Sequence, residues 1–153
     1  MFKKIAVAVV ATTLTLSSTL SYAGPKAEVL HWWTSGGEAK SVAVLQKEFS
    51  KNGGAWTDMP VAGGGGDAAM TALRARVLSG NAPAAVQLKG PSIQEWYEEG
   101  ALADISDVAE QNNWSKVLPA SIAAHMKCEG KWCAAPVNVH RIDWIWANAS
   151  VLS

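Results

Sequence analysis

The chain has 153 residues, and its 13 lysines and arginines balance its 13 aspartates and glutamates. So balanced a chain shows no electrostatic footprint for nucleic acid or for an anionic membrane surface, so neither is expected as a partner. Its length suffices for one modest hydrophobic core, and its neutrality favours small or neutral partners.

Residues 1–23 have the features of a cleavable secretory signal peptide. Lys3 and Lys4 supply the positive start, residues 5–16 form an apolar run, and Ser21-Tyr22-Ala23 has the small-x-small form of a cleavage site. The run is shorter than the roughly 20 residues that a membrane span needs, so an uncleaved anchor is the weaker alternative. We therefore expect export to the periplasm and a mature chain that begins at Gly24.

Three strand–helix units are expected after the signal peptide. Short apolar stretches predict strands over 28–33, 56–61 and 83–88. Apolar residues at helical spacing and runs of Ala and Leu predict helices over 38–50, 68–79 and 93–99. Ser92 is expected to cap the last of these helices, with Glu95 completing a capping box. Strands that alternate with helices favour an α/β domain with a mostly parallel sheet flanked by helices.

From residue 101 onward the pattern is less regular. Short helices are expected over 101–113 and, around Pro119, over 114–127, and an extended aromatic segment is expected over 142–146. The last residues before Ser153 resemble the start of a helix or turn. We therefore expect the chain to be a fragment or a truncated gene product.

Cys128 and Cys133 are separated by four residues that include Gly130, which favours a tight turn. In an oxidising compartment such a close pair predicts one local disulfide, and two free thiols are the alternative. A metal site is disfavoured because only His125 and His140 could add ligands nearby.

Ligands of parallel α/β sheets bind at the carboxyl ends of the strands, here the loops 32–38, 61–67 and 87–91. The first of these loops begins with Trp32 and Trp33, in a chain with eight tryptophans. Adjacent residues of a strand point to opposite faces, so at least one of the two indoles is expected to project into a cleft; the alternative is that both pack in the core. Indole rings suit flat amphipathic ligands, of which sugars are the common case.

Polar candidates lie in the same loops. Glu38 follows two glycines at a helix start, where its carboxylate either complements the helix dipole or accepts hydrogen bonds from ligand hydroxyls. Gln87 and Lys89 lie two apart and share a face if the strand continues, although an exposed polar strand end would look the same.

Catalytic and cofactor signals are lacking in the sequence. The run Gly63 to Gly66 lacks the Gly-Lys-Ser/Thr ending of a nucleotide-binding loop, so a flexible turn at the rim of the cleft is the preferred interpretation. No nucleophile–base pair and no metal-ligand spacing is evident. We therefore expect a binding protein without cofactor or metal, and not an enzyme.

Three segments carry a resemblance: His-Trp-Trp-Thr-Ser-Gly-Gly-Glu at 31–38, Val-Gln-Leu-Lys-Gly at 86–90 and Pro-Val-Asn-Val-His-Arg at 136–141. Together with the signal peptide, they resemble the substrate-binding proteins of bacterial sugar ABC transporters, in the extracellular solute-binding family 1. The chain looks most like the periplasmic glucose/mannose-binding branch of that family.

The resemblance implies two α/β lobes of the type II periplasmic-binding-protein kind with a sugar between them. Residues 24–140 would form the N-terminal lobe and 141–153 the start of the hinge crossing, with the second lobe absent from this chain. The residues implied to hold a monosaccharide are Trp32 and Trp33 against the sugar, Glu38 as hydroxyl acceptor, and Gln87 and Lys89 as further polar groups.

The implied partners are a monosaccharide and an ABC permease in the inner membrane, with a chemoreceptor as a further candidate, and the implied state is a monomer. Two alternatives stay open. A secreted carbohydrate-active enzyme would use Glu38 as acid or base, but the strand-end loops offer only Asp67 as the second carboxylate that glycoside hydrolysis requires. The other alternative is an inactive truncated fragment.

Overall fold

A computed structural model describes residues 24–138 and 147–151 of the chain. The predicted signal peptide over 1–23 and the extended aromatic segment over 142–146 lie outside the described residues. So does most of the predicted hinge crossing.

The core of the fold is a three-stranded parallel sheet in the order β2-β1-β3. Strand β1 (Lys26–His31) is central, β2 (Ala55–Pro60) pairs with it along its whole length, and β3 (Ala85–Val86) pairs with only two of its residues. The predicted strand over 83–88 is therefore much shorter than expected. The parallel arrangement confirms the predicted α/β class.

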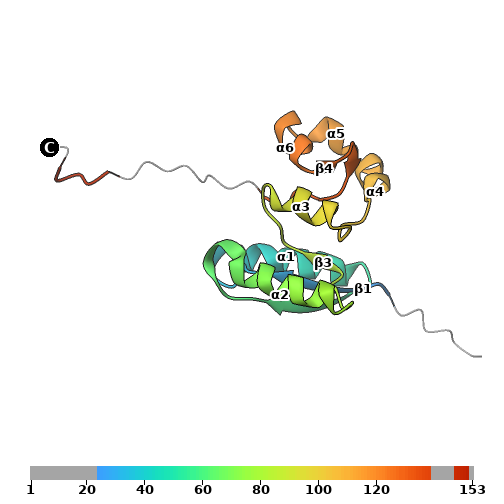
Figure 1. Cartoon of the computed structure of the whole chain (residues 1–153), viewed down its shortest axis with the longest axis horizontal. Coiled ribbons are helices and arrows are strands. Elements are labelled where there is room, and N and C mark those ends of the chain that lie inside the picture. The colour runs from blue at the N-terminus through green and yellow to red at the C-terminus, as the bar shows by residue number, and fades with distance from the viewer. Residues whose placement is uncertain (1–23, 139–146, 152–153) are drawn as a thin grey trace, which may run out of the picture.

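Helices cover both faces of this sheet (Figure 1), with α2 (Asp67–Leu78) on one face and α1 (Gly36–Lys51) on the other. Leu30, which is fully buried, points to the α2 face and packs in one cluster with Ala69, Leu73 and Trp96. The next residue, His31, lies on the α1 face, as the alternation of side chains along a strand requires. Both predicted helices are confirmed to within two residues of their expected ends.

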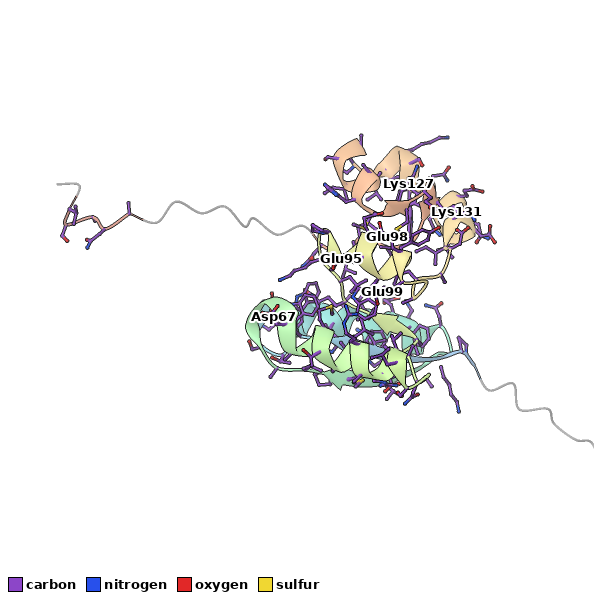
Figure 2. All side chains as sticks on the ribbon, in the orientation of Figure 1. Asp67, Glu95, Glu98, Glu99, Lys127 and Lys131 are labelled. Carbon is purple, nitrogen blue, oxygen red and sulfur yellow. A yellow bond between two sulfur atoms is a disulfide. The ribbon has the colours of Figure 1, made fainter. Side chains whose placement is uncertain are left out.

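Helix α3 (Ser92–Glu98) follows β3 and brings Trp96 to the core. Figure 2 shows Glu99 between α3 and the layer formed by the sheet and α2, and the guanidinium of Arg74 on α2 lies 3.1 Å from its carboxylate. The predicted capping box is wrong. Ser92 lies inside the helix, and its hydroxyl donates to the carbonyl oxygen of Lys89 at 2.6 Å instead of capping the helix.

The rest of the described chain forms a small layer beyond α3. It contains α4 (Ser106–Gln111), α5 (Trp114–Val117), α6 (Ala120–His125) and an antiparallel hairpin of β4 (Lys127–Cys128) and β5 (Lys131–Trp132). The helix expected over 114–127 is thus divided in two at Pro119.

A disulfide joins Cys128 to Cys133, as predicted, with 5.8 Å between their Cα atoms. Both sulfurs are buried against Ile93 of α3, so the crosslink lies in the small core that attaches the hairpin to this helix. Within the described part of the chain, no helix combines the length and apolarity needed to cross a bilayer.

Candidate functional site

Two of the three predicted loops meet at Trp32, directly after the central strand. The backbone N–H of Trp32 donates to the side-chain oxygen of Gln87 at 3.1 Å. The ammonium of Lys89 lies 5.9 Å from the centre of the Trp32 indole ring, within the range of a cation–π interaction. The sheet explains this convergence, because β1 and β3 are parallel neighbours and their carboxyl ends lie at one edge.

The glycine-rich loop lies beside these two loops at the same edge of the sheet. Its residues Gly64–Gly66 form a short 3-10 helix, η1, that leads into α2, and the Lys89 ammonium donates to the carbonyl oxygen of Gly65. Gly66 has a φ of 92°, and a Cβ built there would lie 3.0 Å from the Trp32 indole. Only a glycine fits this position, for reasons of both backbone conformation and close approach. The predicted flexible turn is therefore a defined element packed on Trp32.

Trp33 lies on the α1 face of the sheet, opposite to the face that Trp32 is on, and is 5% exposed. The two adjacent indoles thus point to opposite faces, as expected from strand alternation. Trp33 borders a cleft of about 240 Å³ whose lining consists of His31, Trp33, Thr34, Ala39, Val42, Ala43, Gln46, Asp58 and Pro60.

A hydrogen-bonded network in this cleft includes two residues that sequence reasoning missed. His31, which is 4% exposed, lies 2.9 Å from the Asp58 carboxylate through its Nε2, and its Nδ1 accepts from the backbone N–H of Trp33 at 3.2 Å. Burial raises the pKa of Asp58, but hydrogen bonds from Trp56 and His31 outweigh it and leave this pKa below its ordinary value. The one feature of the sequence that could have pointed to this network is the histidine directly before the paired tryptophans.

Glu38 lies in the first turn of α1 and is exposed. Within residues 24–138 and 147–151 it makes no hydrogen bond or ion pair, so the structure does not bring it into contact with Trp32, Gln87 or Lys89. Its position at the start of α1 still places it after the carboxyl end of β1, at the edge where the three loops lie. A carboxylate there is open to a ligand.

The family model for the bacterial extracellular solute-binding proteins matches residues 33–153. The chain belongs to this family. Over 139 residues the chain is 53% identical to a "probable sugar-binding periplasmic protein" of Rhizobium meliloti, and the aligned segment covers 91% of this chain and 34% of the relative. It is 55% identical over 125 residues to one of the same description from Brucella melitensis, covering 82% of this chain and 30% of the relative. The chain therefore spans about a third of the length of these curated relatives.

A solved structure supports the fold. An ABC substrate-binding protein from Listeria monocytogenes in complex with cycloalternan superimposes with a TM-score of 0.58 at 22% identity, covering 71% of this chain and 27% of the other. This similarity agrees with the α/β fold of the described residues, a parallel sheet flanked by helices.

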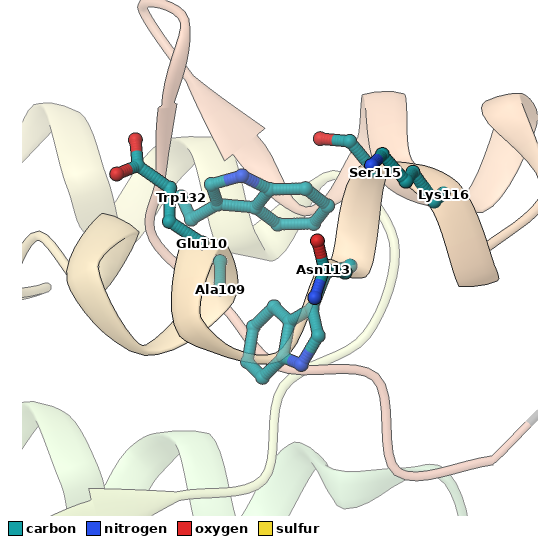
Figure 3. A pocket seen from close by; sticks show the side chains of 7 residues that line it. Ala109, Glu110, Asn113, Ser115, Lys116 and Trp132 are labelled. Atoms are coloured by element: carbon teal, nitrogen blue, oxygen red, sulfur yellow. The ribbon is translucent and has the colours of Figure 1, made fainter.

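A second cleft, of about 190 Å³, lies in the small layer beyond α3 (Figure 3), and its lining includes no residue of the three loops at the edge of the parallel sheet. Its main feature is an edge-to-face pair of Trp114 and Trp132 with 5.4 Å between ring centres. The Lys127 ammonium lies 4.8 Å from the Trp132 ring. These indoles, like Trp96, serve packing, so only part of the tryptophan content relates to the strand-end loops.

Metal binding finds no support in the described part of the solute-binding protein, where no three histidine, cysteine or carboxylate side chains are grouped as ligands. What the strand edge offers instead is indole surface, an ammonium, an amide and an open carboxylate. Groups of these kinds can pack against a ligand and exchange hydrogen bonds with it.

Proposed function

We propose that this solute-binding protein forms the first lobe of a periplasmic receptor that binds a monosaccharide of the glucose or mannose type for an ABC permease. The observation that carries the proposal is the convergence of Trp32, Gln87 and Lys89 at the carboxyl edge of the parallel sheet. The similarity to the probable sugar-binding periplasmic proteins of Rhizobium and Brucella supports both the sugar and the periplasm.

The groups at the edge match the chemistry of a pyranose. The C–H faces of a sugar ring pack on indole surface, for which Trp32 and Trp33 are proposed. The exposed carboxylate of Glu38 accepts hydrogen bonds from sugar hydroxyls, and charge-assisted bonds of this kind are stronger than neutral ones. The Lys89 ammonium donates, and the amide nitrogen of Gln87 remains as a donor while its oxygen is held by Trp32.

A single lobe leaves such a site open to water. Residues 24–140 are proposed to be the N-terminal lobe and 141–153 the start of the crossing to a second lobe. Closure of two lobes around the sugar would remove it from water and create the surface that a permease recognises. Affinity therefore belongs to the complete two-lobed protein.

The test is calorimetric titration of the complete, processed protein with D-glucose, and in parallel with D-mannose, D-galactose and maltose. Micromolar or tighter binding, about −8 kcal/mol, of glucose or mannose with weaker binding of maltose is the expected result. Preference for the disaccharide would refute the monosaccharide assignment. A folded protein that binds none of the four would refute the sugar assignment.

A further inference from the structure

The hydrogen bonds of His31 fix its protonation state. The Trp33 backbone N–H can only donate, so the His31 Nδ1 that it meets at 3.2 Å must accept and carries no proton. The remaining nitrogen, Nε2, therefore carries the proton and donates to the Asp58 carboxylate at 2.9 Å. His31 is thus neutral, in the Nε2–H form, whenever Trp33 is in the observed position.

Asp58 is held in place for this contact. Its Oδ1 also accepts from the indole N–H of Trp56 at 3.0 Å, and its strand β2 pairs with β1 in a continuous parallel register. The lowered pKa of Asp58 keeps it ionised near neutral pH. The network therefore runs without a gap from β2 through His31 to the backbone of Trp33.

No other titratable group faces His31 within the described lining of the cleft. Helix α1 contributes Ala39, Val42, Ala43 and Gln46, none of which carries a charge, and the loop contributes Thr34. The ionised Asp58 favours a charge on the imidazole, while the Trp33 N–H opposes a second proton at Nδ1. Burial of the ring also disfavours the charged form.

We propose that His31 is a positioning residue for the sugar site, which holds Trp33 in its binding arrangement when neutral and releases it when Nδ1 is protonated. The inference rests on the proposed function, in which Trp33 packs against the sugar. Protonation converts the Nδ1 acceptor into a donor that faces another donor, so the 3.2 Å contact is lost and the backbone of Trp33 must shift. Asp58 is already present as the counter-charge, so the protonated ring stays in the fold.

Linkage then makes sugar affinity depend on pH. A ligand that requires the observed Trp33 position binds the neutral form of His31 better, so its dissociation constant rises as His31 takes up a proton. The contact that protonation removes is one buried hydrogen bond, between the Trp33 N–H and the His31 Nδ1. Its net contribution of about 1 kcal/mol corresponds to about fivefold in affinity. The contact fixes the direction, because the neutral ring can accept from the Trp33 N–H and the protonated ring cannot.

Calorimetry with D-glucose on the complete protein at about pH 7.5 and about pH 5.5 tests the proposal. The wild type is expected to bind about fivefold more weakly at the lower pH. In His31→Asn, the side-chain oxygen can accept from the Trp33 N–H as Nδ1 does but does not titrate, and the bond to Asp58 is lost. The affinity that this variant retains is therefore expected to be the same at both pH values. His31→Leu removes the acceptor and weakens binding at both values.

His125, at an exposed position at the end of α6, provides a matched control. His125→Asn is expected to keep the pH dependence of the wild type. A pH dependence that persists in His31→Asn, or that vanishes in His125→Asn, overturns the proposal.

A ligand-free measurement separates this inference from the proposed function. In ¹⁵N-labelled protein, long-range ¹H–¹⁵N spectra should show His31 as the Nε2–H tautomer, and the Trp33 amide resonance should titrate with the same midpoint as the ring. If the network titrates in this way but no sugar binds at either pH, the proposed function fails and the inference falls with it. If sugar binds equally well at both pH values while His31 titrates, the inference alone is overturned.

Discussion

The contact between Gly66 and Trp32 allows a sharp prediction about the strand edge. In Gly66→Ala the new methyl group would lie 3.0 to 3.1 Å from three atoms of the indole ring, which is closer than ordinary van der Waals contact. The backbone φ of 92° adds strain for any residue with a Cβ. Both effects act on the same position, so either Trp32 or the η1 turn must move.

A matched control separates the two effects. Gly80, after the end of α2, also has a positive φ of 71°, but a Cβ there meets no atom within 4 Å. Gly80→Ala should therefore lose only the backbone contribution, about 1 kcal/mol of unfolding free energy. Gly66→Ala should lose about 2 to 3 kcal/mol, since overpacking against Trp32 adds about 1 to 2 kcal/mol.

Urea unfolding measures the loss of unfolding free energy, and calorimetric titration with D-glucose measures the effect on sugar binding. Gly66→Ala is expected to weaken sugar binding because the indole is displaced, whereas Gly80→Ala should bind like the wild type. Equal losses of stability in the two variants, or a Gly66→Ala protein with unchanged affinity, would show that Trp32 is not held against this turn as described.

Three further predictions concern the site, the crosslink and the response to acid. Trp33→Ala and Glu38→Gln should each weaken sugar binding at least tenfold, about 1.4 kcal/mol, by calorimetry, and unchanged affinity in both would remove this site assignment. No thiol should react with a labelling reagent under denaturing, non-reducing conditions, because Cys128 and Cys133 are joined; two labelled cysteines would contradict the crosslink. The lowered pKa of Asp58 means that its contribution to stability is present at neutral pH and is lost as the pH falls below its ordinary value of 3.8. Asp58→Asn should therefore lose less stability than the wild type between pH 5 and about pH 2 in urea unfolding, and an identical loss would count against this role.

The sequence was sufficient to predict the features that depend on local patterns. Apolar spacing predicted α1 and α2, and strand alternation predicted that Trp32 and Trp33 point to opposite faces. The convergence of the three loops followed from the parallel sheet, because its carboxyl ends share one edge. The close cysteine pair was enough to predict the crosslink of the hairpin.

Features that depend on contacts between distant segments were not accessible in this way. His31 and Asp58 are 27 residues apart, and only the parallel register of β1 and β2 brings them together. Ser92 looked like a helix cap because its sequence neighbours fit that pattern, yet its hydroxyl is engaged by the backbone of Lys89. The requirement for glycine at position 66 likewise arises from an indole that lies far away along the chain.

A crystal structure of the complete protein with D-glucose tests the central claim most directly. The sugar is expected at the carboxyl edge of the sheet, in contact with Trp32 or Trp33 and hydrogen-bonded to the carboxylate of Glu38 and to Gln87 or Lys89. A sugar bound elsewhere, for example in the cleft beside Trp114 and Trp132 (Figure 3), would contradict the assignment of the site to the strand ends.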